Sequence, residues 1–268
     1  MNTTSLGTAL VTGASSGIGA LYADRLARRG HDLILVARNG QRLAALADRL
    51  VTDTGRSVRT LVADLADGAD LRAVEDVLRT DPTITLLVNN AGVGATATLL
   101  DADVDKMEAM IALNVTALTR LTYAAAPAFA ARGAGTIVNI ASIAAVAPEL
   151  LNGVYGASKA FVLALTQSLH HELAAKGLRL QAVLPGATAT EFWGLAGMPV
   201  EHLPSAIVMS AADLVDAALA GLDAGELVTL PSLPDAADWQ RLEQARLALG
   251  PNLSRAAPAA RYRTAVEA

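Results

Sequence analysis

Tyr155 and Lys159, four positions apart, are the residues best suited to acid–base chemistry. They lie near the start of a predicted helix, so their side chains share one face, one turn apart. A free phenol, with a pKa of about 10, is too weak an acid at neutral pH. An ammonium group about 4 Å away would lower that pKa by roughly three units before desolvation is counted, to about 7, where a general acid or base works best. An isolated Tyr-x-x-x-Lys pair is more often an ordinary exposed pair on a helix. The other motifs in the sequence must therefore show whether this pair has a catalytic role.

A glycine-rich turn, Thr12-Gly13-Ala14-Ser15-Ser16-Gly17-Ile18-Gly19, follows the first predicted strand and runs directly into a helix. Glycines let the backbone turn tightly and approach a pyrophosphate closely. The helix N-terminus supplies free N–H groups and a partial positive charge to the phosphates. This placement predicts a dinucleotide site rather than merely a tight turn, and it favours an acid–base role for Tyr155.

The elements that position these residues alternate along the chain. Short apolar runs predict seven strands, at 8–12, 31–37, 57–63, 85–89, 136–140, 178–184 and 226–230. Helical patterns lie between them, among them 103–131, 155–176 and 211–221. This alternation predicts an α/β fold with a doubly wound, seven-stranded parallel sheet. We expect one catalytic domain over residues 1–232, and a C-terminal appendix over 233–268 with a helix near 235–249.

Composition excludes several other classes of protein. The 268 residues contain no cysteine and carry a net charge of −5, so disulfides, thiolate metal sites and a nucleic-acid footprint are not expected. The chain is 53% hydrophobic, but no apolar run approaches the ~18 residues of a spanning helix. We expect no signal peptide and no membrane partner, and therefore a cytoplasmic protein. The histidines show no metal-ligand spacing, so no metal is expected.

The glycine spacing Gly-x-x-x-Gly-x-Gly, the run Asn89-Asn90-Ala91-Gly92 and the Tyr155/Lys159 pair together resemble the short-chain dehydrogenase/reductase family in its single-domain form. The resemblance covers roughly residues 5–232. It implies a Rossmann fold, a nicotinamide cofactor and oxidation or reduction at a carbonyl or alcohol carbon.

The resemblance also implies roles for four catalytic residues. Tyr155 would exchange the proton, and Lys159 would lower the pKa of Tyr155 and bind the nicotinamide ribose. Ser142 would orient the substrate oxygen, and the backbone carbonyl of Asn114 would hold a relay water. From the residues alone, Asn114 reads equally well as a satisfied core amide. The implied cofactor contacts are Gly13, Ser15, Ser16, Gly17, Ile18, Gly19, Arg38, Asp64, Leu65, Asn90, Ala91, Gly92, Tyr155, Lys159, Pro185, Gly186 and Thr188.

The end of the second predicted strand favours NADP(H) over NAD(H). An NAD site places an acidic side chain there to hold the ribose hydroxyls. This chain has Ala37 followed by Arg38, whose guanidinium suits a 2′-phosphate. Arg42, one turn later, is a candidate to assist. The alternative is that Arg38 is simply an exposed arginine at a strand end.

The segment 187–208 follows the sixth predicted strand, and the resemblance implies that it forms a lid over the substrate. It contains Phe192 and Trp193 but no lysine or arginine. These two aromatic rings, with Ser142 and Tyr155, are predicted to line the substrate pocket; the alternative is that the rings fasten the loop to the body. The missing cation argues against a phosphate or carboxylate on the substrate, so we expect a neutral, mainly apolar ketone or aldehyde.

The sequence thus predicts an NADPH-linked carbonyl reductase or alcohol dehydrogenase. One alternative is a catalytically silent NAD(P)-binding regulator, which the intact Ser142, Tyr155 and Lys159 disfavour. Another is a nucleotide-sugar epimerase or dehydratase, which has a larger C-terminal domain. The resemblance implies that the helices predicted at 103–131 and 155–176 pair with those of a second copy. Both are apolar around much of their circumference, which agrees with a buried interface, so a homodimer or homotetramer is expected.

Overall fold

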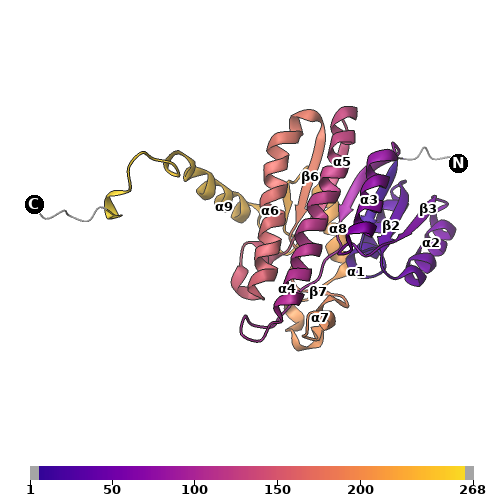
Figure 1. Cartoon of the computed structure of the whole chain (residues 1–268), viewed down its shortest axis with the longest axis horizontal. Coiled ribbons are helices and arrows are strands. Elements are labelled where there is room, and N and C mark those ends of the chain that lie inside the picture. Colours follow the sequence, from indigo (N-terminus) through magenta and orange to yellow (C-terminus); the bar gives the residue numbers. More distant parts are fainter. Residues whose placement is uncertain (1–5, 263–268) are drawn as a thin grey trace, which may run out of the picture. The chain divides into compact units, whose positions relative to one another are not determined.

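The computed structural model describes residues 6–262, and the chain divides into two compact units, 1–231 and 232–268. The first unit contains a seven-stranded, wholly parallel sheet in the order β3-β2-β1-β4-β5-β6-β9 (Figure 1). The strand order reverses between β1 and β4. The strands are β1 (Thr8–Thr12), β2 (Asp32–Ala37), β3 (Val58–Val62), β4 (Ile84–Asn89), β5 (Gly135–Ile140), β6 (Leu178–Val183) and β9 (Val228–Thr229). This is the Rossmann-type α/β fold that was predicted.

Helices cover both faces of the sheet. Residues of α1 (Gly17–Arg28), α2 (Gly40–Thr54) and α8 (Ala211–Asp223) pack in one core cluster with Ala9 and Val11 of β1. Residues of α3 (Gly68–Thr80), α5 (Leu118–Arg132) and α6 (Gly153–Leu173) pack in the other with Leu10. Successive strand residues point to opposite faces, so a strand covered on both sides must be apolar throughout. All five residues of β1 are buried, as this arrangement requires.

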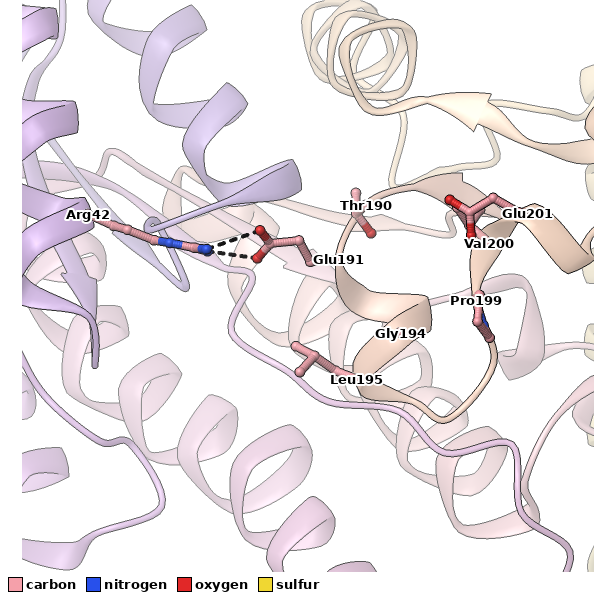
Figure 2. Close-up of a pocket in the computed structure, with 8 residues that line it drawn as sticks. All are labelled: Arg42, Thr190, Glu191, Gly194, Leu195, Pro199, Val200 and Glu201. Carbon is pink, nitrogen blue, oxygen red and sulfur yellow. Dashed lines mark hydrogen bonds and ion pairs between the residues drawn. The ribbon is translucent and has the colours of Figure 1, made fainter.

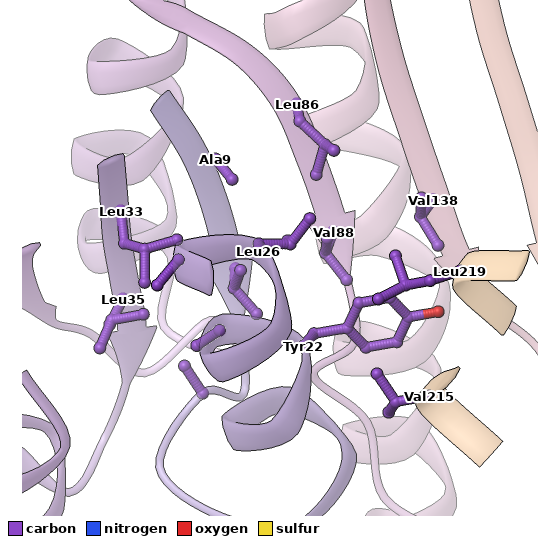
Figure 3. Close-up of a cluster of buried hydrophobic side chains, with 14 of the residues drawn as sticks. Ala9, Tyr22, Leu26, Leu33, Leu35, Leu86, Val88, Val138, Val215 and Leu219 are labelled. Atoms are coloured by element: carbon purple, nitrogen blue, oxygen red, sulfur yellow. The ribbon is translucent and has the colours of Figure 1, made fainter. Parts of the chain in front are cut away.

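A tyrosine lies in the centre of the first core cluster. The Tyr22 ring packs beside Val215 and Leu219 (Figure 3), and its side chain is fully buried. Its hydroxyl has no hydrogen-bond partner within residues 6–262. Burial raises the pKa of Tyr22 well above its ordinary value, so the phenol stays neutral.

The helix predicted at 103–131 is not continuous. It consists of α4 (Val104–Ile111), a π-helical turn η1 (Ala112–Ala117) and α5. A π turn inserts one extra residue and widens the helix locally, which is frequent at functional sites. Asn114 lies within this turn. The hydrophobic period of the sequence does not reveal the insertion, because apolar residues continue on both sides of it.

The lid segment is more ordered than a plain loop. Its two ends pair as the short strands β7 (Thr188–Ala189) and β8 (Met209–Ser210). Between them lie α7 (Phe192–Leu195) and two 3₁₀ turns, η5 (Val200–His202) and η6 (Ser205–Ile207). The two ends of the lid therefore lie side by side, where β7 pairs with β8.

The second unit contains α9 (Ala236–Ala248), which begins where the Asp235 carboxylate accepts a hydrogen bond from the N–H of Ala237. Two 3₁₀ turns follow, η7 (Gly250–Asn252) and η8 (Ala260–Tyr262). Within residues 6–262, no helix is long and apolar enough to span a bilayer.

Candidate active site

The glycine turn after β1 is held against the end of β4. Gly13 and Gly17 have φ values of +65° and +53°, a region that residues with a side chain rarely enter. The Asn90 amide donates to the carbonyl oxygens of Thr12 (2.9 Å) and Gly13 (3.2 Å). A Cβ on Gly19 would lie only 2.3 Å from the Gly13 oxygen. Only glycine therefore fits the third position of the turn.

The N-terminus of α1 is left open by its own sequence. Ser16 precedes the helix, but within the described residues its side chain makes no capping hydrogen bond. In contrast, Asn39, Asp67, Asn152 and Ser210 cap α2, α3, α6 and α8 with side-chain oxygens. Among residues 6–262, the first-turn N–H groups of α1 thus have no side-chain partner. Together with the bare backbone of the glycine turn, they form a cradle that suits a pyrophosphate.

At the end of β2, Arg38 follows the buried residue Ala37. The Arg38 side chain is 70% exposed, and its guanidinium lies 3.8 Å from the Asp64 carboxylate at the end of β3. Leu65 next to it is buried. Three of the predicted adenosine contacts therefore lie at the carboxyl ends of neighbouring strands, with the guanidinium only loosely paired.

All four predicted catalytic residues are buried. Ser142 follows β5, and its hydroxyl accepts a hydrogen bond from the N–H of Ala144 (3.1 Å). Tyr155 lies in the first turn of α6, which the Asn152 side chain caps. The Asn152 side chain also donates to the carbonyl of Ala97 (2.7 Å), which ties the start of α6 to the loop after β4. The Ser142 hydroxyl is hydrogen-bonded to the Tyr155 phenol.

Lys159 lies one turn further along α6, with its ammonium directed into the protein. Its Nζ donates to the carbonyl oxygen of Ile140 (2.9 Å) at the end of β5 and lies 5.8 Å from the centre of the Tyr155 ring. Burial lowers the pKa of Lys159 to about 8, because a charged amine loses its hydration there.

The direction predicted for the Tyr155 pKa is wrong. Burial raises the pKa of the phenol above its ordinary value, and the hydrogen bond with Ser142 offsets only part of that rise. The sequence spacing gives the closeness of Lys159 but not the loss of water around the phenol. Desolvation disfavours the phenolate, and here it outweighs the effects that lower the pKa.

Asn114 ties three segments together. Its amide donates to the carbonyl of Val93 (2.9 Å) and to the hydroxyl of Ser158 (3.2 Å), and its Oδ1 accepts from the N–H of Val93 (3.0 Å). The side chain is thus a satisfied core amide, the alternative that the sequence left open. The predicted role of its backbone carbonyl stays a prediction. A Cβ on Gly92 would lie 3.1 Å from Asn114 Oδ1 and 3.5 Å from Lys159 Nζ, so these three residues converge.

The two lid aromatics have different surroundings. The Phe192 ring lies 5.8 Å from the Tyr155 ring, centroid to centroid. A Cβ on Gly94 would come within 2.2 Å of Phe192, so the loop after β4 accepts this ring only because position 94 is glycine. Trp193 is buried and donates its indole N–H to the carbonyl of Thr188 (3.0 Å). Trp193 therefore fastens the lid to the body, which is the alternative that the sequence left open. The pocket-lining role of Phe192 stays a prediction.

An apolar wall surrounds Tyr155, and most of its residues were not singled out from the sequence. Met110 and Ala144 are buried against Tyr155. The other members, partly buried, are Val93, Ala95, Met107, Leu151, Val154 and Phe192. The sequence did contain one indication of this wall: Met107 and Met110 are three positions apart on the helix before Asn114, so they share one face. These side chains would give a substrate carbonyl at Tyr155 apolar surroundings.

The lid is also joined to α2 by an ion pair that the sequence did not predict. Arg42 binds the Glu191 carboxylate through two hydrogen bonds (Figure 2). Beside this pair lies a cavity of about 400 Å³, lined by the lid residues Thr190, Gly194, Leu195, Pro199, Val200 and Glu201.

Pro185, Gly186 and Thr188 lie where β6 passes into the lid. The carbonyl of Pro185 accepts from the N–H of Ile143, next to Ser142, and the Thr188 hydroxyl donates to the carbonyl of Gly186. The first of these bonds holds the start of the lid beside Ser142. The contacts predicted between these residues and a nicotinamide amide stay predictions.

Known proteins resemble this chain over most of its length. The family model described as short chain dehydrogenase matches residues 7–197. The solved structure of a short-chain dehydrogenase from Sphingobium yanoikuyae in complex with NADPH is 53% identical, with a TM-score of 0.94, and the match covers 96% of this chain and all of that one. The bulky-bulky ketone specific alcohol dehydrogenase from Comamonas testosteroni is 47% identical, with a TM-score of 0.90, over 97% of this chain and all of that one.

A more distant relative is sulfoacetaldehyde reductase 2 of Chromohalobacter salexigens. It is 39% identical over 186 residues, which are 68% of this chain and 73% of that protein.

Proposed function

This chain belongs to the short-chain dehydrogenase/reductase family and is an oxidoreductase of CH–OH and C=O groups, and we propose that it reduces bulky, neutral, apolar ketones with NADPH. The observation that carries the proposal is the position of Tyr155. Its phenol is hydrogen-bonded to Ser142, lies within 6 Å of the Lys159 ammonium measured from the ring centre, and is walled by apolar side chains.

The residues present fit NADP(H). The open N-terminus of α1 and the glycine turn would hold the pyrophosphate, and Arg38 would pair with the 2′-phosphate. Asp64 and Leu65 would border the adenine, and Asn90 and Gly92 the riboses. The similar Sphingobium protein was solved in complex with NADPH, which supports the same choice here.

A bound nicotinamide would supply a hydride at the carbonyl carbon, and the side chains would provide the proton. Ser142 would donate a hydrogen bond to the substrate oxygen and fix its position. Tyr155 would then give its phenolic proton to that oxygen. Because burial raises the pKa of Tyr155, the phenol is fully protonated at neutral pH and ready to donate.

Lys159 would stabilise the phenolate that remains. With a pKa of about 8, its amine is largely protonated at pH 7, and the surrounding apolar side chains strengthen its attraction for a nearby anion. Asn114, held by Val93 and Ser158, would keep the loop after β4 and helix α6 in register beside Lys159.

The apolar wall supports a neutral substrate with a large hydrocarbon part. Met107, Met110, Leu151 and Phe192 offer contact area but no charge. The Comamonas relative is named for ketones that are bulky on both sides of the carbonyl, and its likeness extends over nearly the whole chain. We therefore include such ketones in the proposal.

The proposal is tested by following NADPH consumption with a panel of carbonyl compounds. Ketones with two bulky apolar substituents should give the highest kcat/KM, methyl ketones less, and sulfoacetaldehyde little. Binding of NADPH without turnover of any carbonyl compound would contradict an enzymatic role and favour a regulator. Preference for sulfoacetaldehyde would contradict the substrate class alone.

Self-association belongs to the same proposal. Ile111, Tyr123 and Phe161 expose large apolar side chains on α4, α5 and α6. A second copy that covered these helices would remove that surface from water. We therefore propose a homodimer or homotetramer, which sedimentation velocity distinguishes from a monomer.

A further inference from the structure

The ion pair between Arg42 and Glu191 joins parts of the chain that are 149 residues apart. Arg42 Nη1 donates to Glu191 Oε2 (2.7 Å), and Nη2 donates to Oε1 (3.1 Å), so the pair is a two-bonded fork (Figure 2). About half of each side chain is exposed, at 49% for Arg42 and 59% for Glu191. An exposed pair of this kind contributes little stability, so both side chains are free to exchange partners.

Arg42 lies at the adenosine end of the proposed cofactor site. Helix α2 begins at Gly40, directly after β2 and Arg38. The Asn39 side chain accepts a hydrogen bond from the N–H of Arg42 (3.0 Å), which fixes the first turn. Arg42 therefore projects from the turn of helix that follows the proposed 2′-phosphate ligand, Arg38.

Glu191 lies at the start of the lid. Thr190, the residue before it, is close to the glycine turn: a Cβ on Gly17 would lie 3.3 Å from its methyl group. Phe192, the residue after it, begins α7 and packs against Tyr155. The ion pair thus connects the adenosine end with the segment that carries the ring over the acid–base phenol.

A guanidinium fork binds a carboxylate and a phosphate through the same N–H groups, so it cannot hold both in this geometry. We infer that Arg42 is a second cation for the 2′-phosphate of NADP(H), and that Glu191 competes for it, so that a bound 2′-phosphate releases the lid from α2. This inference rests on the proposed cofactor. Because a phosphate monoester carries more negative charge than a carboxylate, it wins the exchange and repels Glu191.

Two fragments separate the 2′-phosphate from the rest of the cofactor: adenosine 2′,5′-bisphosphate, which has it, and 5′-AMP, which lacks it. Calorimetric titration of the full-length protein gives the Kd of each. Arg42→Gln should weaken bisphosphate binding by about tenfold, and Glu191→Gln should tighten it by about threefold, as expected for exposed charge pairs. Binding of 5′-AMP should not change.

A double variant and a matched control isolate the competition. In the Arg42→Gln background, Glu191→Gln should no longer tighten binding, because no guanidinium remains to be freed. Glu201 lines the same cavity with the same charge, but Arg42 is paired with Glu191. Glu201→Gln should therefore leave the bisphosphate Kd unchanged. Tightening by Glu191→Gln in both backgrounds, or equally by Glu201→Gln, would mean general repulsion and overturn the inference.

The lid itself is observed through Trp193, one of two tryptophans in the chain; Trp239→Phe removes the other signal. Adenosine 2′,5′-bisphosphate should shift Trp193 emission, whereas 5′-AMP should not, and Glu191→Gln should show the shifted emission without ligand. Unchanged emission in Glu191→Gln would overturn lid release while leaving the proposed function standing. Failure of the unmodified protein to bind the bisphosphate would overturn both the cofactor and the inference.

Discussion

The ring of Phe192 lies over the ring of Tyr155, 5.8 Å away and tilted by 50°. The adjacent Trp193 stands edge-on to Phe192 at 5.7 Å and is anchored through its indole N–H to Thr188. One lid aromatic therefore closes the apolar wall above the phenol, while its neighbour holds the lid in place. Gly94 provides the space for the first ring.

Phe192→Ala should raise KM for bulky apolar ketones by about tenfold, and much less for small ones, because apolar contact energy scales with the area buried. The measurement is kcat and KM for a series of ketones that differ only in substituent size. Equal effects across the series would mean that the Phe192 ring does not touch the substrate.

Trp193→Phe is the matched control, since it keeps an aromatic ring but removes the bond to Thr188. A loosened anchor affects every substrate alike, so we expect a similar loss of kcat/KM for small and large ketones. The lid should also become more sensitive to limited proteolysis. A size-dependent effect in this variant would assign Trp193 to the pocket.

Lys159→Met should stabilise the protein at neutral pH. The lysine has a pKa of about 8 when folded and 10.5 in its ordinary state, so between these values the unfolded chain binds more protons. Burying the charged lysine therefore costs stability below pH 8, and this cost disappears as the pH rises through 10.5.

The variant should gain about 1–3 kcal/mol in unfolding free energy at pH 7, reduced by the lost bond to Ile140, and much less at pH 10.5. Urea denaturation at both pH values measures the difference. A gain that is the same at both, or a loss at pH 7, would contradict the burial of a charged Lys159.

Tyr22→Phe removes a buried hydroxyl that has no hydrogen-bond partner in residues 6–262. Since an unsatisfied buried polar group costs free energy, we expect stabilisation by about 1 kcal/mol. The control is Tyr262→Phe, because Tyr262 is exposed. Thermal unfolding of the two variants decides: destabilisation by Tyr22→Phe would indicate that the hydroxyl is satisfied in solution.

The sheet and the glycine turn could be predicted because their causes are local. Leu33 to Val36 form a continuous apolar run, which is typical of a buried strand. Gly13, Gly17 and Gly19 lie close together between a predicted strand and a predicted helix. The π turn at Asn114 could not, because the bonds that hold it come from Val93 and Ser158, on other elements. The pairing of Arg42 with Glu191 could not be predicted either, because the fold brings together two residues that are 149 positions apart.

The Tyr155 pKa shows a different limit. Spacing on a helix predicts which groups are neighbours, and Tyr155 and Lys159 are indeed neighbours. The direction of the pKa shift depends on whether attraction to the Lys159 ammonium or desolvation of the phenol is the larger effect. Desolvation depends on how much water reaches the phenol, and residues of the lid and of α4 that pack around it limit that access.

Cofactor preference should be reversed by two substitutions at the end of β2. The unmodified protein should favour NADPH over NADH by about tenfold in kcat/KM, a modest ratio because the Arg38 side chain is 70% exposed. Ala37→Asp with Arg38→Leu should favour NADH, since the carboxylate repels a 2′-phosphate and accepts from ribose hydroxyls. Equal Kd values for the two cofactors in the unmodified protein at low salt would contradict the assignment of Arg38.

The most direct test of the central claim is the activity of Tyr155→Phe with NADPH and a bulky ketone, measured together with NADPH affinity. The substitution removes the phenolic proton but keeps the ring that packs against Phe192. We predict at least a ~10²-fold loss of kcat, the usual contribution of a general acid, with the NADPH Kd and the unfolding transition unchanged. Near-normal turnover by Tyr155→Phe would contradict the assignment of Tyr155 as the proton donor and, with it, the proposed mechanism.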